Sequence, residues 1–143
     1  MNKFNIALLT EAKIQLDISK RLLILSTNLS NNKIFSKILK ELTKSLLKIV
    51  EIYSIIEKHN GKDKNLLFFK KIAPRLIHEK DRINLIDLLI LTRKCNTSSI
   101  EFSRKNNLIM FSEGKFIHIS KDKIISFIHS LEHLMSHFST KKA

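Results

Sequence analysis

The sequence predicts a mainly α-helical protein, a compact helical bundle with a long antiparallel helix pair and a small β-hairpin or meander before the last helix. Apolar residues recur at helical spacing over two long segments near the start and again near the end. Two glycines and one proline in 143 residues are too few for the turns of a β-sandwich or barrel, or for a glycine-rich Rossmann loop. The 43% hydrophobic share is enough for a core, and the length suits one domain over residues 1–143.

Two long helices are expected first, over residues 4–28 and 33–58. Between them Ser30-Asn31-Asn32 interrupts the pattern, and Asn32 is a good N-cap for the second helix. Asn60-Gly61 is a strong stop signal, and a short break between long helices favours an antiparallel pair. The apolar positions at helical spacing are Ala7, Ile14, Ile18, Leu22 and Leu25 in the first helix, and Phe35, Ile38, Leu39, Leu42, Leu46, Ile49, Tyr53 and Ile56 in the second.

Two shorter helices are expected next. The third covers residues 63–73 and ends or kinks at Pro74. The fourth covers residues 82–94, with Asp81 as its N-cap. The apolar residues predicted to face the core are Leu66, Phe69 and Ile72 in the third helix, and Ile83, Ile86, Leu89 and Ile90 in the fourth. Together with the first pair, these segments make a helical bundle over residues 1–98.

Residues 99–119 change character and predict a β-hairpin or three-strand meander. Segment 100–103 alternates apolar and polar residues, and segments 108–111 and 116–119 do so less cleanly. Asn106-Asn107 and Glu113-Gly114 supply turn residues between them. A final helix is expected over 120–138, capped by Ser120 and with Asp122 in its first turn, and residues 139–143 are expected to fray. The residues predicted to face the core are Ile124, Ile128, Leu131, Met135 and Phe138.

The composition favours an anionic partner. The chain carries 26 basic and 13 acidic residues, a net charge of +13, which is typical of proteins that bind nucleic acid, acidic lipid or an acidic protein. Lysines outnumber arginines by 21 to five, and A/T-rich coding also enriches lysine, so genome composition is a second explanation for the charge. The planar guanidinium of arginine binds phosphate through two parallel hydrogen bonds, which lysine cannot do. The scarcity of arginine therefore weakens the case for a dedicated phosphate site.

The most specific basic pattern is a lysine stripe on the predicted second helix. Its members recur every three or four residues, within an arc of about 80° almost opposite the apolar face, and span roughly 22 Å. A nucleic-acid backbone could follow such a ridge, releasing counterions at each contact. The alternative is the ordinary solvent face of a lysine-rich helix. The stripe consists of Lys33, Lys37, Lys40, Lys44 and Lys48, with Lys70 and Lys71, beside Phe68-Phe69, as possible additions.

Other reactive side chains form weaker patterns. His129, His133 and His137 recur every four residues on the polar side of the last helix, where an i,i+4 pair could chelate Zn, Cu or Ni. A solvated face is the simpler interpretation, and residues 129–133 match the inverted zinc-protease string H-x-x-E-H without a downstream acidic third ligand. The single cysteine, Cys95, excludes a disulfide framework and is interpreted as structural. No metal or other cofactor is expected.

The chain resembles the HEPN superfamily of helical domains. The similarity lies in Leu8 to Arg21, in Phe35 to Ile56 and in Arg93 to Phe102, which lead towards a final amphipathic helix. Many HEPN proteins are ribonucleases, commonly dimeric, or partners of nucleotidyltransferases in toxin–antitoxin systems, and their active site uses Arg, four to six residues, then His. None of the five arginines here, Arg21, Arg75, Arg82, Arg93 and Arg104, has a histidine at that distance. The resemblance therefore implies a catalytically silent relative that binds RNA or other proteins.

These observations predict a noncatalytic, basic binding module that associates with RNA, or another polyanion, through the lysine stripe. The alternative is a structural or interaction module that pairs with itself, as a HEPN-like dimer, or with an acidic or toxin–antitoxin-type partner. A divergent ribonuclease ranks third. No apolar run of about 20 residues occurs, so no membrane insertion is expected. Charges throughout residues 1–26 argue against a secretory signal, and a cytoplasmic location is expected.

Overall fold

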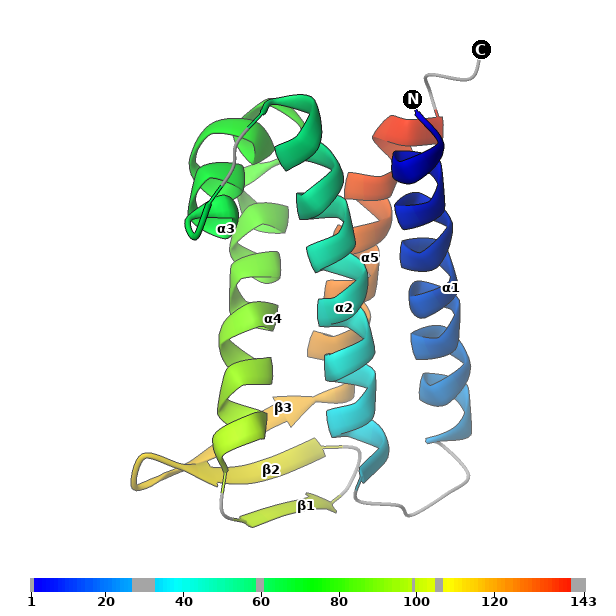
Figure 1. Ribbon diagram of the computed structural model, residues 1–143. Coiled ribbons are helices and arrows are strands. Elements are labelled where there is room, and N and C mark those ends of the chain that lie inside the picture. Colours follow the sequence, from blue (N-terminus) through cyan, green and yellow to red (C-terminus); the bar gives the residue numbers. More distant parts are fainter. Residues whose placement is uncertain (1, 27–32, 59–60, 99, 105–106, 140–143) are drawn as a thin grey trace.

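The computed structural model describes residues 2–26, 33–58, 61–98, 100–104 and 107–139. Its four long helices are α1 (Lys3–Leu25), α2 (Lys33–Ile56), α4 (Glu79–Thr97) and α5 (Lys121–Ser139). Along the chain they run alternately up and down, and a small sheet lies across one end of the bundle (Figure 1). The predicted mainly α fold, with its antiparallel first pair, is therefore confirmed. The proposed caps and stops at Asn32 and Asn60 lie outside the described residues.

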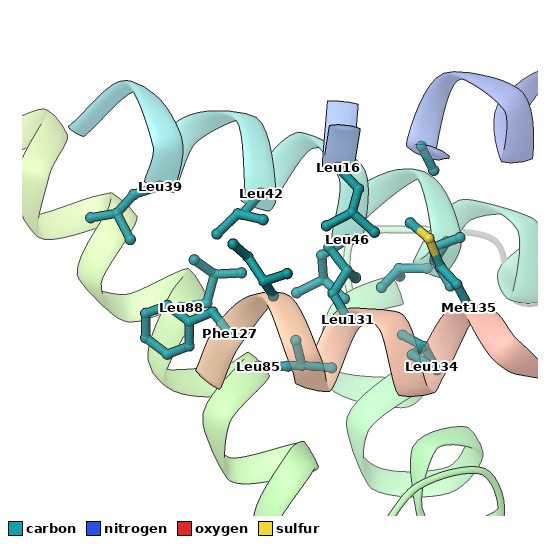
Figure 2. Close-up of a cluster of buried hydrophobic side chains, with 14 of the residues drawn as sticks. Leu16, Leu39, Leu42, Leu46, Leu85, Leu88, Phe127, Leu131, Leu134 and Met135 are labelled. Atoms are coloured by element: carbon teal, nitrogen blue, oxygen red, sulfur yellow. The ribbon is translucent and has the colours of Figure 1, made fainter. Parts of the chain in front are cut away.

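The helix α2 is the centre of the molecule. Its apolar face is continuous, and Ile38, Leu42 and Ile49 are fully buried, as the spacing predicts. Side chains of all four long helices gather around it, including Leu16 of α1, Leu88 of α4 and Phe127 of α5 (Figure 2). One predicted member of this face is wrong, because Ile56 ends the helix and is 48% exposed.

The predicted apolar stripe of α1 is not its buried face. The helix buries Asn5, Leu9, Ala12, Leu16 and Ser19, which alternate four and three residues apart. Small side chains at Ala12 and Ser19 let α2 approach closely, and the Ser45 hydroxyl of α2 donates to the backbone carbonyl of Ala12 at 2.7 Å. Most of the stripe that the sequence favoured lies on the outer side, where Ile14 and Ile18 are 53% and 38% exposed, whereas its member Leu22 packs partly against the core. The apolar residues of α1 occupy two faces, and close approach decided between them.

A similar correction applies to α4. It begins at Glu79, three residues earlier than predicted, and buries Asn84, Leu85, Leu88, Thr92 and Cys95. The predicted core residues Ile83, Ile86 and Ile90 are 51%, 38% and 44% exposed, whereas Leu89 packs partly against the core. On α4, polar residues replace part of the buried face, because Thr92 bonds to Thr43 of α2 at 2.7 Å and Asn84 bonds to Ser130 of α5.

The predicted third helix is broken into three short pieces. A single turn, α3 (Lys64–Leu67), continues into a π-helical turn, η1 (Phe68–Ile72), and a 3₁₀ turn, η2 (Ala73–Arg75), that contains Pro74. Phe69 and Ile72 are buried as predicted, but Leu66 is 63% exposed. Phe68 is buried too, in an edge-to-face pair with Phe69 at 5.1 Å between ring centroids. The wider π turn changes the angle between successive side chains, so two adjacent rings reach the core.

The meander and the last helix agree with the sequence prediction, except that Asn107, predicted as a turn residue, begins a strand. The strands β1 (Ile100–Arg104), β2 (Asn107–Ser112) and β3 (Lys115–Ser120) form an antiparallel sheet in the order β1-β2-β3. Glu113 and Gly114 connect β2 to β3, both with positive φ, as a two-residue hairpin turn requires. Ser120 caps α5 by accepting from the backbone N–H of Lys123 at 3.1 Å. All five predicted core residues of α5 are buried: Ile124, Ile128, Leu131, Met135 and Phe138.

Candidate nucleic-acid interface

The lysine stripe lies on the solvent face of α2. Lys33, Lys37, Lys40 and Lys44 are exposed and Lys48 is half-buried, so the structure brings all five to one side of one helix. The face is exposed because the buried apolar residues of α2 point the other way, towards α1, α4 and α5. Because α2 is packed at the centre of the bundle, its backbone is held in place. The distances between the ammonium groups can therefore change only through motion of the lysine side chains. We call this face the lysine ridge.

Lys44 and Lys48 of the lysine ridge are engaged in ion pairs. Lys44 Nζ lies 3.3 Å from Glu41 on the same helix, and Lys48 Nζ lies 2.8 Å from Glu11 of α1. Among the described residues, Lys37 and Lys40 make no ion pair. These two side chains therefore offer the least obstructed positive charge on the ridge.

A shallow hollow adjoins the ridge between α1 and α2. It has a volume of about 310 Å³ and is lined by Leu8, Lys44, Leu47, Lys48 and Glu51. Leu47 is 39% exposed, so the hollow combines an apolar wall with two lysines. The apolar wall could contact a nucleobase while the lysines contact the adjoining phosphates.

The predicted additions to the ridge belong to a different element. Lys70 and Lys71 are exposed, but they lie in the π turn η1. Their neighbours Phe68 and Phe69 are buried in the core, so neither ring is available for base stacking. This region is joined to α2 by the Phe68 ring, whose centroid lies 5.8 Å from that of Tyr53, and by the ion pair from Lys64 of α3 to Glu51, at 2.9 Å.

The histidines of α5 differ in their surroundings. His129 and His133 are exposed, and His133 Nδ1 lies 2.9 Å from a carboxylate oxygen of Asp81. His137 instead hydrogen-bonds through Nε2 to the backbone carbonyl of Leu76. Within the described ranges, no group of three or more His, Cys, Asp or Glu side chains is placed to hold a metal ion.

Asp81 has a role that the sequence did not indicate. It was predicted to cap α4, but it lies inside the first helical turn, and His78 takes the cap position without a side-chain hydrogen bond. One of its carboxylate oxygens accepts from the buried Ser130 hydroxyl at 2.8 Å, and the other faces His133. Burial raises the pKa of this carboxyl. The hydrogen bonds to His133 and Ser130, with the nearby charges of His133 and His78, outweigh burial and hold the pKa below its ordinary value of 3.8.

The contacts of Asp81 continue along the interface between α4 and α5. Ser130 also accepts from the side-chain amide of Asn84, at 3.2 Å. Lys123 of α5 donates to the Asn84 carbonyl oxygen at 3.1 Å and lies 3.2 Å from Asp87. The partners are 36 to 52 residues apart in sequence. No local pattern could therefore have identified them.

The contacts within this polar cluster are those of a structural network and differ from those of a catalytic triad. Asp81 orients His133, as an acid orients a general base, but the Ser130 hydroxyl donates to Asp81. A nucleophilic serine would instead donate to the histidine ring. Cys95 is buried, and its Sγ lies 3.4 Å from Met110 Sδ, in keeping with the structural interpretation.

Comparison with known proteins identifies no family for this chain. No family model matches the chain, and no curated protein and no solved structure shows significant similarity to it. The resemblance to HEPN domains therefore stays a prediction. In the part of the chain that the structure describes, none of the helices combines the length and the apolar character needed to cross a membrane.

Proposed function

We propose that this protein is a noncatalytic module that binds single-stranded RNA through the lysine ridge of α2. The observation that carries the proposal is the exposure of successive lysines along one face of the central, well-packed helix. A phosphate backbone that follows the ridge meets a cation at each helical turn and releases a counterion at each contact. The preference for RNA over DNA rests on the HEPN resemblance.

The hollow beside Lys44 and Lys48 supports a single strand over a duplex. The bases of a duplex are paired and stacked, whereas a single strand can turn a base towards an apolar wall such as that formed by Leu8 and Leu47. The proposal does not involve the buried rings Phe68 and Phe69. Affinity is therefore expected to come mainly from phosphate contacts and to depend steeply on salt.

The test compares two charge-reversal variants with the same net charge. Lys37→Glu with Lys40→Glu changes the ridge where no described ion pair is broken. Lys62→Glu with Lys115→Glu changes two exposed lysines outside α2 and is the matched control. Each double variant lowers the net charge from +13 to +9. Binding to a fluorescent single-stranded RNA is measured by anisotropy at several salt concentrations.

The proposal predicts that the ridge variant loses at least tenfold in affinity near physiological salt, while the control loses much less. Five phosphate contacts give a log–log salt slope of about −3.5 for a single strand, and loss of two contacts reduces its magnitude by about 1.4. Equal losses in the two variants would show that overall charge, and not the ridge, attracts the RNA. A matched DNA strand that binds equally well would remove the preference for RNA.

A further inference from the structure

The hollow between α1 and α2 combines apolar, basic and acidic side chains on one small surface. Four of its lining residues follow one another at helical spacing along the flank of α2 that faces α1: Lys44, Leu47, Lys48 and Glu51. Leu8 of α1 lies on the opposite side. The volume of about 310 Å³ is at the lower end of the range for small-molecule sites. The hollow therefore suits one planar ring that packs on the leucines and turns its edge towards the polar groups.

Glu51 supplies the hydrogen-bond acceptor among the described side chains that line the hollow. Its carboxylate is bonded to Lys64 Nζ of α3, at 2.9 Å from one oxygen and 3.3 Å from the other, and its side chain is 36% exposed. A carboxylate has about four lone-pair sites, and the contact with Lys64 uses one on each oxygen. The ion pair also limits the orientations of the carboxylate, which lowers the entropic cost of binding a ligand. Glu51 can therefore accept two parallel hydrogen bonds from a ligand in the hollow.

We propose that the hollow binds a guanine base of the RNA and that Glu51 selects this base. The inference rests on the proposed function, because the strand on the lysine ridge brings the base to the hollow. Guanine presents two adjacent donors on its Watson–Crick edge, the N1–H and the N2 amino group, and a carboxylate accepts from both. The ring packs against Leu8 and Leu47. Lys44 and Lys48 face the phosphates on either side of the base.

The other three bases match a carboxylate poorly. Adenine and cytosine each place one amino group beside a ring nitrogen that is itself an acceptor, and uracil places one N–H between two carbonyl groups. Each of these acceptors would face the negative carboxylate without a donor, which costs free energy. A carboxylate also repels phosphate, so Glu51 weakens binding wherever no pair of donors meets it. Its position beside the ridge therefore favours a role in base selection over a role in affinity for the backbone.

The test places a single guanosine in the middle of a uridine strand that is long enough to cover the ridge. Replacements at that one position are adenosine, cytidine, uridine, inosine and 7-deazaguanosine, and binding is measured by anisotropy. Inosine lacks the N2 amino group, whereas 7-deazaguanosine keeps both Watson–Crick donors and changes only N7. The guanosine and 7-deazaguanosine strands are expected to bind about fivefold more tightly than the adenosine, cytidine and uridine strands, the low end for a bidentate base contact. The inosine strand is expected to lose part of this advantage.

Two glutamate variants separate base selection from charge. Glu51→Gln replaces the carboxylate by an amide with one acceptor and one donor, which can pair with the edge of either purine. Glu57→Gln is the matched control, because the side chain of Glu57 is also 36% exposed and forms an ion pair with Arg75, at 2.6 Å. Each variant removes one negative charge and raises the net charge from +13 to +14. The Glu51→Gln protein is expected to bind guanosine and adenosine strands equally, while the control keeps the fivefold difference.

The outcomes distinguish this inference from the proposed function. Affinities that do not depend on the central base, or an inosine strand that binds as tightly as the guanosine strand, would overturn the inference and leave the ridge in place. These measurements use the wild-type protein, so they do not depend on a variant that folds. A guanosine preference that persists in a folded Glu51→Gln protein, checked by circular dichroism, would also overturn it. Conversely, a preference for guanosine in a protein whose ridge variant loses no more affinity than its control would support the hollow and contradict the ridge.

Discussion

Asp81 shows how one side chain can join two helices that the sequence treats separately. Its carboxylate accepts from Ser130, which is 1% exposed, and pairs with His133, so it joins the first turn of α4 to the middle of α5. A charged acceptor contributes more than a neutral one, and the ordinary helix-capping role would have used only local backbone donors. The lowered pKa of Asp81 is the sign that the folded state favours the ionised form.

Replacement of Asp81 by Asn is expected to destabilise the protein by about 1–2 kcal/mol at neutral pH, because the neutral amide pairs less strongly with Ser130 and His133. A carboxyl whose pKa is lowered by folding stabilises the native state above its unfolded pKa. That stabilisation is lost as pH falls through the folded pKa. The difference between wild type and variant should therefore shrink below about pH 4.

Urea denaturation at a series of pH values measures this difference. Asp63→Asn is the control, since Asp63 is exposed and makes no side-chain cap bond to α3. Its effect is expected to stay within about 0.5 kcal/mol. A loss for Asp81→Asn that is as large at pH 3 as at pH 7 would show that the charge of Asp81 does not matter.

At the scale of helices, the sequence predicted the buried face correctly for helices with one apolar face. It predicted the buried face incorrectly for helices with two apolar faces. On α2 and α5 the polar residues lie opposite a single apolar stripe, so core, solvent face and lysine ridge were all predictable. On α1 and α4 apolar residues occupy both sides. There the buried side is chosen by contacts that span the fold, such as Ser45 with Ala12 and Thr43 with Thr92. Helical periodicity carries no information about such contacts.

The orientation of α4 can be tested with two alanine substitutions. Leu88 is fully buried, whereas Ile90, predicted from the sequence to be core, is 44% exposed. Leu88→Ala is expected to cost about 2–5 kcal/mol through lost burial and a cavity, and Ile90→Ala less than about 1 kcal/mol. Urea midpoints at low protein concentration give both values. The reverse order would mean that the isoleucine face of α4 is the one that packs.

At the scale of the molecule, the lysine ridge is a local concentration of a charge that the whole chain shares. The ridge belongs to α2, and the ion pair of Lys48 with Glu11 connects it to α1. The net charge is +13, but charges act independently beyond a Debye length of about 8 Å at physiological salt. Only lysines that lie close together, as on the ridge, can therefore act on one RNA strand as a unit.

RNA length should therefore show whether the ridge is the whole binding surface. An oligonucleotide that covers the ridge of about 22 Å is expected to reach nearly the full affinity, because phosphates beyond the last lysine of the ridge release no further counterions. Anisotropy titrations with single strands of increasing length measure this. A salt slope that keeps steepening for strands several times longer would show that lysines outside α2 also contact the RNA.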